Sequence, residues 1–502
     1  MAIEATIQGK KTRMGYEHWI ALFLFFGVGV RVFRYSLGLP IWGDEGFLGV
    51  NILDRNFRQL LRPMEYIQVA PLGYLWAQRG MFLLFGMSEY VMRLISTVAG
   101  IAGLILFVIW AVKIAEPLAA AIAVGVLAVS DIAVRNAVQL KPYGIDLLAG
   151  VALLYLATGF LLDRRTKWLW LLAGATPVAL FFSLPSVFVA AGIAAILLLQ
   201  MPRMTGGQRT IVIAFVAAGG ATFGLLYWSF IGPQLATTGP LQEICWIFPP
   251  RGFHPWEFAV WFFRSHTGNF LGYPVDLASP GCLPSFLLLV IGAVMLFRSR
   301  RVDLGLLMIS PFVMTLAAAI LRRYPYGDSQ RVGQHLVGPI CLLIGIGSAA
   351  VIRRLARSEN AVRRAGATVC ILLLVIGLIG PAALVLAPSA ETKRDFTVRQ
   401  FVRGTMSVIS PNTTIAVIED TAHADILSRW YIHEGSHRIL WGVGIGGLDA
   451  IRSRPLLIVS SPIELDGLDR RIGRQMGAAP SWEASLPVPK QVGYLFMDYS
   501  NR

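Results

Sequence analysis

Long apolar runs with few charges recur through the first 390 residues of the chain. A helix needs about 20 mostly apolar residues to cross the core of a bilayer, and eleven segments are candidates. They are residues 18–39, 94–112, 117–134, 143–162, two segments within 168–202 that are split at 183–186, 210–230, 277–297, 304–321, 332–352 and 365–388. Two of these runs contain polar residues that a span can tolerate: Arg31 and Arg34 in 18–39, and Asp146 near the start of 143–162. The pattern predicts a polytopic α-helical membrane protein with about eleven spans.

The composition supports this interpretation. Of the 502 residues, 55% are hydrophobic and only 15% are charged, whereas soluble domains are about 25% charged. The four cysteines form no CxxC pair, so we expect them to pack in apolar surroundings. No small-residue cleavage site follows residues 10–30, so we expect the first apolar run to be a span and not a signal peptide.

The basic residues are unevenly distributed over the connections between apolar segments. The chain has 44 Lys+Arg against 29 Asp+Glu, and 16 of these cations lie in alternate connections. They are Lys10, Lys11, Arg13, Arg164, Arg165, Lys167, Arg203, Arg209, Arg298, Arg300, Arg301, Arg353, Arg354, Arg357, Arg363 and Arg364. Because cytoplasmic loops are enriched in Lys and Arg, we predict a cytoplasmic N terminus and, after eleven spans, an extracytoplasmic C terminus. Topology thus accounts for the basic excess, and we expect no nucleic-acid partner.

Two long connections, 40–92 and 231–277, fall on the predicted outer face. The first contains amphipathic stretches at 47–61 and 72–85, which are typical of helices lying in the membrane interface. We therefore assign residues 1–390 to a transmembrane domain with two large outer loops.

The chain becomes more charged from residue 391 onward. Strand-like runs at 414–418, 439–441, 455–460 and 492–497 alternate with helical stretches at 422–431 and 465–474. Such alternation is typical of an α/β fold. We predict a small extracytoplasmic α/β domain over residues 391–502.

Two adjacent carboxylates, Asp44 and Glu45, follow the outer end of the first predicted span. Carboxylates at a membrane edge are costly to keep there unless they are used, so both are candidate catalytic residues. The sequence leaves open an ordinary charged loop or a helix cap, a position that Asp favours.

Basic and aromatic residues gather at two other outer span ends. They are Arg135, Lys141 and Tyr143 in one cluster, and Arg322, Arg323, Arg331 and His335 in the other. The positive-inside rule gives cations no role on this side, so they indicate an anionic ligand, and Arg and Lys are the usual partners of phosphate. Snorkelling of long side chains toward the interface is the alternative.

Together these features resemble the GT-C superfamily of polyprenyl-phosphate-sugar glycosyltransferases, over roughly residues 15–350. The likeness lies in the order and sidedness of Asp44-Glu45, Ala70-Pro71-Leu72-Gly73-Tyr74, Ser88-Glu89-Tyr90-Val91-Met92-Arg93-Leu94, Lys141-Pro142-Tyr143 and Tyr324-Pro325-Tyr326-Gly327. It is greatest to the branch with protein O-mannosyltransferases, aminoarabinose transferases and lipopolysaccharide-core sugar transferases. The resemblance implies a transferase of the bacterial inner membrane that takes a hexose or pentose from a polyprenyl-phosphate donor. Its extracytoplasmic acceptor would be a glycan, a lipid or a protein of the cell envelope.

The resemblance also suggests a role for each candidate residue. We expect Asp44 to deprotonate or orient the acceptor hydroxyl in an inverting reaction, with Glu45 assisting. An anionic phosphate leaving group needs charge stabilisation more than a general acid. We assign that task to Lys141 and Arg331, with Arg135, Tyr143 and His335 as secondary ligands. No metal ligand and no cofactor is assigned, and a divalent metal beside Asp44 and Glu45 stays open.

Two functions of other classes are open as well. A flippase or transporter of a polyprenyl-linked anion would use the same outer cations, but it should carry charges near the middle of the membrane and a repeat between halves. No repeat is visible in the sequence. A non-catalytic scaffold would leave the outer carboxylates and cations unexplained.

Two familiar motifs occur within residues 391–502. His433, Glu434 and His437 fit the zinc motif H-E-x-x-H, which requires a helix, but Gly435 and Ser436 are poor helix formers. Residues 442–447 contain G-x-G-x-x-G, although nicotinamide cofactors are not expected outside the cytoplasm. We therefore expect neither a zinc protease nor a dinucleotide site.

Overall fold

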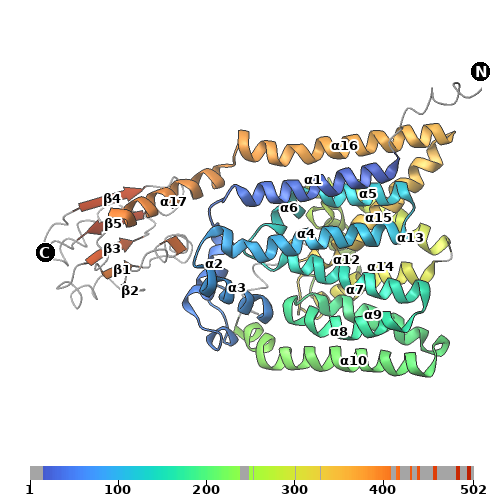
Figure 1. Cartoon of the computed structure of the whole chain (residues 1–502), viewed down its shortest axis with the longest axis horizontal. Coiled ribbons are helices and arrows are strands. Elements are labelled where there is room, and N and C mark those ends of the chain that lie inside the picture. The colour runs from blue at the N-terminus through green and yellow to red at the C-terminus, as the bar shows by residue number, and fades with distance from the viewer. Residues whose placement is uncertain are drawn as a thin grey trace, which may run out of the picture.

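The computed structural model describes residues 15–237, 248–252, 254–299, 301–327 and 329–408, and in the C-terminal part 414–418, 430–431, 438–440, 456–460, 482–486 and 494–498. Long helices of the first part run side by side as a bundle, and the strands lie beyond one end of it (Figure 1). The N-terminal helix begins at the opposite end of the bundle. The two predicted parts of the chain thus differ in structural class.

Among the described residues, eight helical segments are long and apolar enough to cross a membrane. They are α1 (Tyr16–Ser36), α4 (Glu89–Ile114), α7 (Tyr143–Asp163), α9 (Ser186–Gln200) extended to Arg203, α10 (Gly206–Leu226) extended to Thr237, α14 (Val302–Ile320), α15 (Val337–Leu355) with the turn before it, and α16 (Glu359–Leu386). Two shorter apolar helices, α8 (Thr166–Phe182) and α13 (Leu283–Arg298), and the bent pair α5 (Pro117–Val129) and α6 (Asp131–Ala137) complete the set. The chain is a multi-pass membrane protein, as predicted.

The segment predicted as a span over 117–134 is bent, because α5 and α6 meet at an angle of 60°. Ser130 between them has extended backbone, with φ −64° and ψ 114°, and the break leaves carbonyl groups of α5 without helical partners. The fully buried Arg31 of α1 donates to Leu127 O at 3.4 Å and to Gly27 O of its own helix at 2.8 Å. A cation inside a span is therefore satisfied by backbone carbonyls at the bend.

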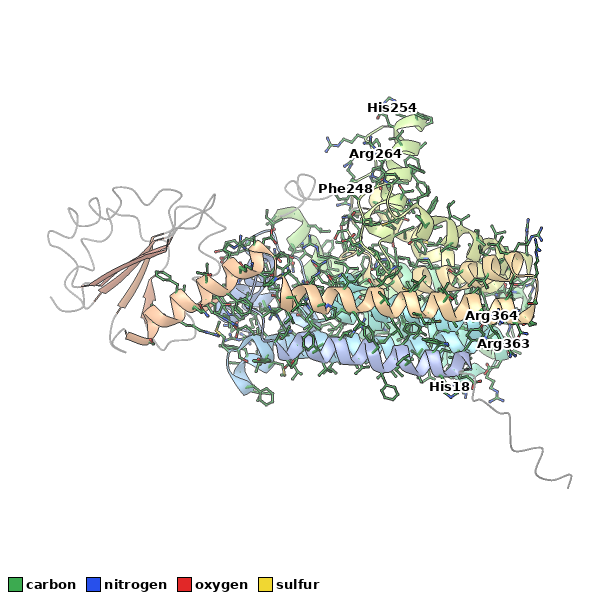
Figure 2. All side chains as sticks on the ribbon, turned by 90° about the horizontal axis from the view of Figure 1, so that it is seen from above. His18, Phe248, His254, Arg264, Arg363 and Arg364 are labelled. Carbon is green, nitrogen blue, oxygen red and sulfur yellow. The ribbon has the colours of Figure 1, made fainter. Side chains whose placement is uncertain are left out.

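Connections predicted to share a side of the membrane also share an end of the bundle. Arg301 Nη1 donates to Ile114 O at 2.7 Å, and Arg353 and Arg164 pair with Glu116 and Asp303 at 2.8 and 3.4 Å. His18, Arg363 and Arg364 lie at this same end, away from the strands (Figure 2). Which end faces the cytoplasm stays a prediction from the positive-inside rule.

The outer connections are partly helical. The first contains α2 (Gly43–Asp54), a 3₁₀ turn (Gln59–Leu61) and α3 (Leu72–Phe85), at the end of the bundle nearest the strands (Figure 1). The second contains α12 (Pro255–Thr267), which projects from the side of the bundle where Figure 2 labels His254 and Arg264. In the first loop, α3 matches the amphipathic stretch predicted at 72–85, and α2 and the 3₁₀ turn overlap the stretch predicted at 47–61.

The C-terminal part opens with α17 (Ala390–Val408) and contains a five-stranded mixed sheet of order β2-β1-β3-β5-β4. The strands are β1 (Thr414–Ile418), β2 (Arg438–Leu440), β3 (Leu456–Ser460), β4 (Trp482–Leu486) and β5 (Tyr494–Asp498). β1 pairs in parallel with β2 and β3, and β5 pairs antiparallel with β3 and β4. Four strands match predictions to within two residues, whereas β4 was not predicted. The predicted helix 465–474 lies outside the described residues, as does 422–431 apart from its last two residues.

An apolar cluster joins this C-terminal part to the end of the bundle. Val398 and Val402 of α17, with Trp430 and Tyr431, are buried in the same cluster as residues of α2 and α3. The Tyr431 hydroxyl accepts a hydrogen bond from Ile41 N at 3.0 Å. The segment that leads into α2 is therefore fixed from the C-terminal side.

Candidate functional site

Asp44 lies in the first turn of α2, where the helix dipole favours a carboxylate. Lys141 Nζ donates to Asp44 Oδ1 at 3.0 Å, and Arg331 Nη1 donates to Asp44 Oδ2 at 3.3 Å. The two cations come from positions 97 and 287 residues further along the chain. The structure thus brings the three principal sequence-predicted residues together, with one carboxylate shared by two cations.

Lys141 lies in the connection between α6 and α7, and its side chain is only 7% exposed. Its ammonium group donates a second hydrogen bond to Gln68 Oε1, at 2.6 Å. Gln68 follows Tyr66 and Ile67, which both have left-handed backbone, with φ of 60° and 59°. That conformation is costly for a β-branched residue and typical of functional sites. Gln68 was not predicted, because a neutral amide in a long loop gives no charge signal.

The pairing changes the proton affinities of both groups. Burial would raise the pKa of Asp44, but the charges of Lys141 and Arg331, with hydrogen bonds from Lys141 and Gln68, hold it below its usual range. Burial lowers the pKa of Lys141, and the attraction of Asp44 offsets this only in part. As it stands, Asp44 is therefore an anion and a weak base.

Glu45 points away from this cluster and is fully buried. Arg93 Nε donates to Glu45 Oε1 at 2.8 Å, and Arg93 Nη2 also pairs with Oε2. The backbone N–H groups of Leu140 and Trp42 donate to the same carboxylate at 2.6 and 3.4 Å. Glu45 therefore ties the start of α2 to α4 and to the connection that carries Lys141.

A cavity of about 240 Å³ opens beside Asp44. Its polar lining residues are Asp44, Gln68, Lys141, Tyr143, Asp146, Arg323, Tyr324 and Arg331. The rest of the wall is largely apolar and includes Leu184, Pro185, Val187, Phe188, Phe223, Tyr227, Ile231 and Leu235. Tyr227 and Ile231 belong to a π-helical turn at the end of α10, a distortion that is frequent at functional sites. Charged residues in the lining could bind the head group of an amphiphilic anion, and the apolar part of the wall could hold its tail.

The remaining predicted residues lie at different places. Tyr143 lines the cavity, whereas Arg135 and His335 do not. Arg135 pairs with Asp131 at 3.5 Å, and the buried His335 shares a hydrogen bond with Thr315 at 2.9 Å. Arg323 lines the cavity, but Arg322 turns away and donates to Pro249 O at 2.9 Å. The structure therefore separates the secondary candidates into residues that line the cavity and residues that do not.

The other chemistry considered from the sequence is absent or falls outside the described residues. The H-E-x-x-H and G-x-G-x-x-G motifs, at 433–437 and 442–447, lie outside them. Within the part of the chain that the structure describes, no group of three or more His, Cys, Asp or Glu is placed to hold a metal ion. Cys282, Cys341 and Cys370 are buried free thiols, as expected for cysteines that serve in packing.

Comparison with known proteins supports the fold. No protein-family model matches the sequence, and no curated protein matches it. A crystal structure of ArnT from Cupriavidus metallidurans bound to undecaprenyl phosphate is similar, with a TM-score of 0.55 and 13% identity over 95% of this chain and 98% of that one. ArnT from the same organism in the apo state gives a TM-score of 0.52 at 13% identity, over 96% and 98% of the two chains. The chain therefore has a GT-C-like fold.

Proposed function

We propose that the chain is a membrane glycosyltransferase that moves a sugar from a polyprenyl-phosphate carrier to an extracytoplasmic acceptor. The observation that carries this proposal is Asp44, held between Lys141 and Arg331 at the edge of a largely apolar cavity. A base next to two phosphate-binding cations suits transfer from a phosphate leaving group. The similar ArnT structure, which contains undecaprenyl phosphate, supports a lipid-linked donor.

In the proposed reaction, an acceptor hydroxyl oxygen attacks the anomeric carbon of the donor. The bond from that carbon to the phosphate oxygen breaks as the new glycosidic bond forms on the opposite face, so the configuration inverts. Asp44 takes the hydroxyl proton, and the carrier leaves as its phosphate anion beside Lys141 and Arg331. A positioned base contributes about 10² to 10⁴ in rate, and fixed cations stabilise the charge of the leaving group.

Donor binding would also activate the base. Without donor, both cations are committed to Asp44, which keeps its pKa low. A phosphate that attracts Lys141 and Arg331 withdraws positive charge from the carboxylate, so the pKa of Asp44 rises and the group becomes a better proton acceptor. The base would therefore be weak until a donor is present to react.

The other predicted residues take supporting roles in this proposal. Glu45 positions α2 through Arg93 and does not touch substrate. Tyr143 and Arg323 face the donor from the cavity wall, and His335 packs against the lining residues Phe188 and Tyr324. Arg135 pairs with Asp131 and has no role at the cavity. The positive-inside rule supports an extracytoplasmic reaction. We further propose that the membrane is a bacterial inner membrane and that the sugar is a hexose or pentose.

A transfer assay tests the proposal. The protein in nanodiscs is given undecaprenyl-phosphate-linked hexoses or pentoses and a cell-envelope extract as acceptor, and release of undecaprenyl phosphate and the anomeric configuration of the product are measured. We expect acceptor-dependent release with inversion, and a fall of about 10² or more for Asp44→Asn. Asp131→Asn is the matched control, since Asp131 pairs with Arg135 outside the cavity. Movement of intact donor across a vesicle bilayer without sugar release would instead identify a transporter.

A further inference from the structure

One acidic residue of the cavity is not used by this reaction. Asp146, in the first turn of α7, is 5% exposed and lines the cavity. Its Oδ1 atom has no hydrogen-bond partner, and no Lys or Arg of the described residues interacts with its carboxyl group. The Ser183 hydroxyl lies close to this carboxyl group.

The isolation of Asp146 stands out against the other buried carboxylates. Four Asp or Glu residues are buried in the described part of the chain: Glu45, Glu89, Asp146 and Asp395. Three of them pair with arginine, namely Glu45 with Arg93, Glu89 with Arg399 and Arg403, and Asp395 with Arg394. An unsatisfied buried polar group is costly and indicates a missing partner. Since Asp146 lines the cavity, a ligand in the cavity is the partner that the structure lacks.

The surroundings of Asp146 indicate which kind of ligand that is. Tyr143, one turn earlier on α7, interacts electrostatically with Asp44, Arg331 and Asp146, so it lies near both the charged cluster at Asp44 and Asp146. Phe188 and Tyr324 line the same wall, with their rings 4.9 Å apart. Carboxylates accept hydrogen bonds from hydroxyl groups, and aromatic faces pack against the C–H face of a ring. A carboxylate among aromatic rings is therefore suited to a sugar.

We propose that Asp146 binds hydroxyl groups of the sugar that the donor carries, in a subsite completed by Tyr143, Tyr324 and Phe188. This inference rests on the proposed function and divides the cavity into two parts. Lys141 and Arg331 hold the phosphate, and Asp146 holds the sugar attached to it. Asp146 would thus determine which sugar the enzyme accepts.

Binding of two probes separates the two parts of the cavity. One probe is bare undecaprenyl phosphate, and the other is undecaprenyl phosphate carrying a hexose or pentose, each titrated against the full-length protein in nanodiscs. We expect Asp146→Ala to weaken binding of the sugar-bearing probe by about 10- to 100-fold, the effect of losing hydrogen bonds to a charged group. The affinity for the bare probe should stay unchanged. Asp146→Asn retains one acceptor oxygen and should lose less affinity for the sugar-bearing probe. Lys141→Ala should weaken binding of both probes.

Asp303→Ala is the matched control, because Asp303 occupies the first turn of α14 as Asp146 does in α7, but at the other end of the bundle. Melting temperatures of all variants are recorded, and if Asp146→Ala does not fold, Asp146→Asn gives the decisive comparison. Equal effects on the two probes, or no effect on either, would overturn the sugar subsite while leaving the phosphate site intact. Failure of the wild-type protein to bind either probe would instead remove the proposed function itself.

Discussion

In the proposed reaction, Asp44 and the donor phosphate compete for the same two cations. Lys141 and Arg331 lie 3.0 and 3.3 Å from the carboxylate oxygens, so an incoming phosphate must draw both cations from an existing partner. In this proposal the two cations pair with Asp44 before the donor binds and with the donor phosphate afterwards. This arrangement distinguishes a catalytic Asp44 from one that simply holds the fold together.

Replacing Asp44 with Asn should therefore have opposite effects on binding and turnover. Asn keeps the size of the side chain but carries no charge, so Lys141 and Arg331 become available to phosphate. We expect undecaprenyl phosphate to bind Asp44→Asn at least as tightly as the wild type while turnover falls by about 10² or more. Titration beside single-turnover kinetics measures both quantities. Weaker phosphate binding by a folded Asp44→Asn protein would contradict the exchange.

The depressed pKa of Asp44 also predicts how stability depends on pH. A carboxyl group whose pKa is lower in the folded state stabilises the protein fully above its unfolded value of about 3.9, and this contribution is lost as the pH falls through the folded value. We expect the wild type to melt above Asp44→Asn at pH 7 and the difference to shrink as the pH drops below about 4. Melting curves of both proteins in one detergent test this. If the difference in melting temperature grew on acidification, the pKa of Asp44 would instead be raised in the folded protein.

Arg331 should not be replaceable by lysine. Its guanidinium reaches Asp44 and lies over the Trp42 ring, 5.8 Å from the centroid, and a planar fork binds two phosphate oxygens where an ammonium group acts as a point charge. We expect Arg331→Lys to weaken use of the donor by about 10-fold, on the scale of one charged hydrogen bond. Donor titration checks this against Arg264→Lys, which is outside the cavity. Equal donor affinity in both variants would argue against bidentate binding.

At the scale of elements, the apolar spans were predictable because their pattern is long and largely uninterrupted. The bend after α5 was not, since it depends on Ser130 and on Arg31 donating from a neighbouring helix. Asp44, Lys141 and Arg331 could be singled out from their charge on the predicted outer side, but the ion pairs between them could not, because their partners lie far apart in the sequence. Asp146 was interpreted as a polar residue that a span tolerates, because its neighbours in space come from other helices.

The strand β4 was missed for a local reason. Its sequence alternates Trp482, Ala484 and Leu486 with Glu483 and Ser485, but it is short, and Ala and Glu are weak strand formers. It pairs along its whole length with β5, so backbone hydrogen bonds to the neighbouring strand stabilise a strand that the local sequence favours only weakly. Tertiary pairing of this kind is not visible from propensity.

The C-terminal part should stabilise the start of α2 through two contacts. Glu89, at the start of α4, pairs with Arg399 and Arg403 of α17 at 3.2 and 3.0 Å. The Tyr431 hydroxyl accepts from Ile41 N, three residues before Asp44. We expect Tyr431→Phe, which leaves a buried N–H unsatisfied at a cost of about 1–3 kcal/mol, to lower both the melting temperature and turnover. Tyr90→Phe, at an exposed hydroxyl, is the control, and an unchanged melting temperature for Tyr431→Phe would show that this contact does not stabilise the fold.

At the scale of the whole molecule, the two ends of the bundle should face different compartments. A reporter that is active only outside the cytoplasm should be active when fused after Arg502 and silent when fused after Arg298, the last residue of α13. The expectation follows from the 16 cations that share one set of connections. The reverse pattern would place Asp44 in the cytoplasm and exclude an extracytoplasmic transferase.

The long sequence separations within the site have a consequence for how the protein is made. Arg331 follows Asp44 by 287 positions, and Tyr431 follows Ile41 by 390. At about 5–20 residues per second of synthesis, the ribosome needs roughly 15 s to 1 min to pass from Asp44 to Arg331. During that interval the nascent chain holds a carboxylate at the membrane surface without its full set of cations. A stalled or truncated chain would therefore insert most of its spans and still lack charge balance at the proposed active site.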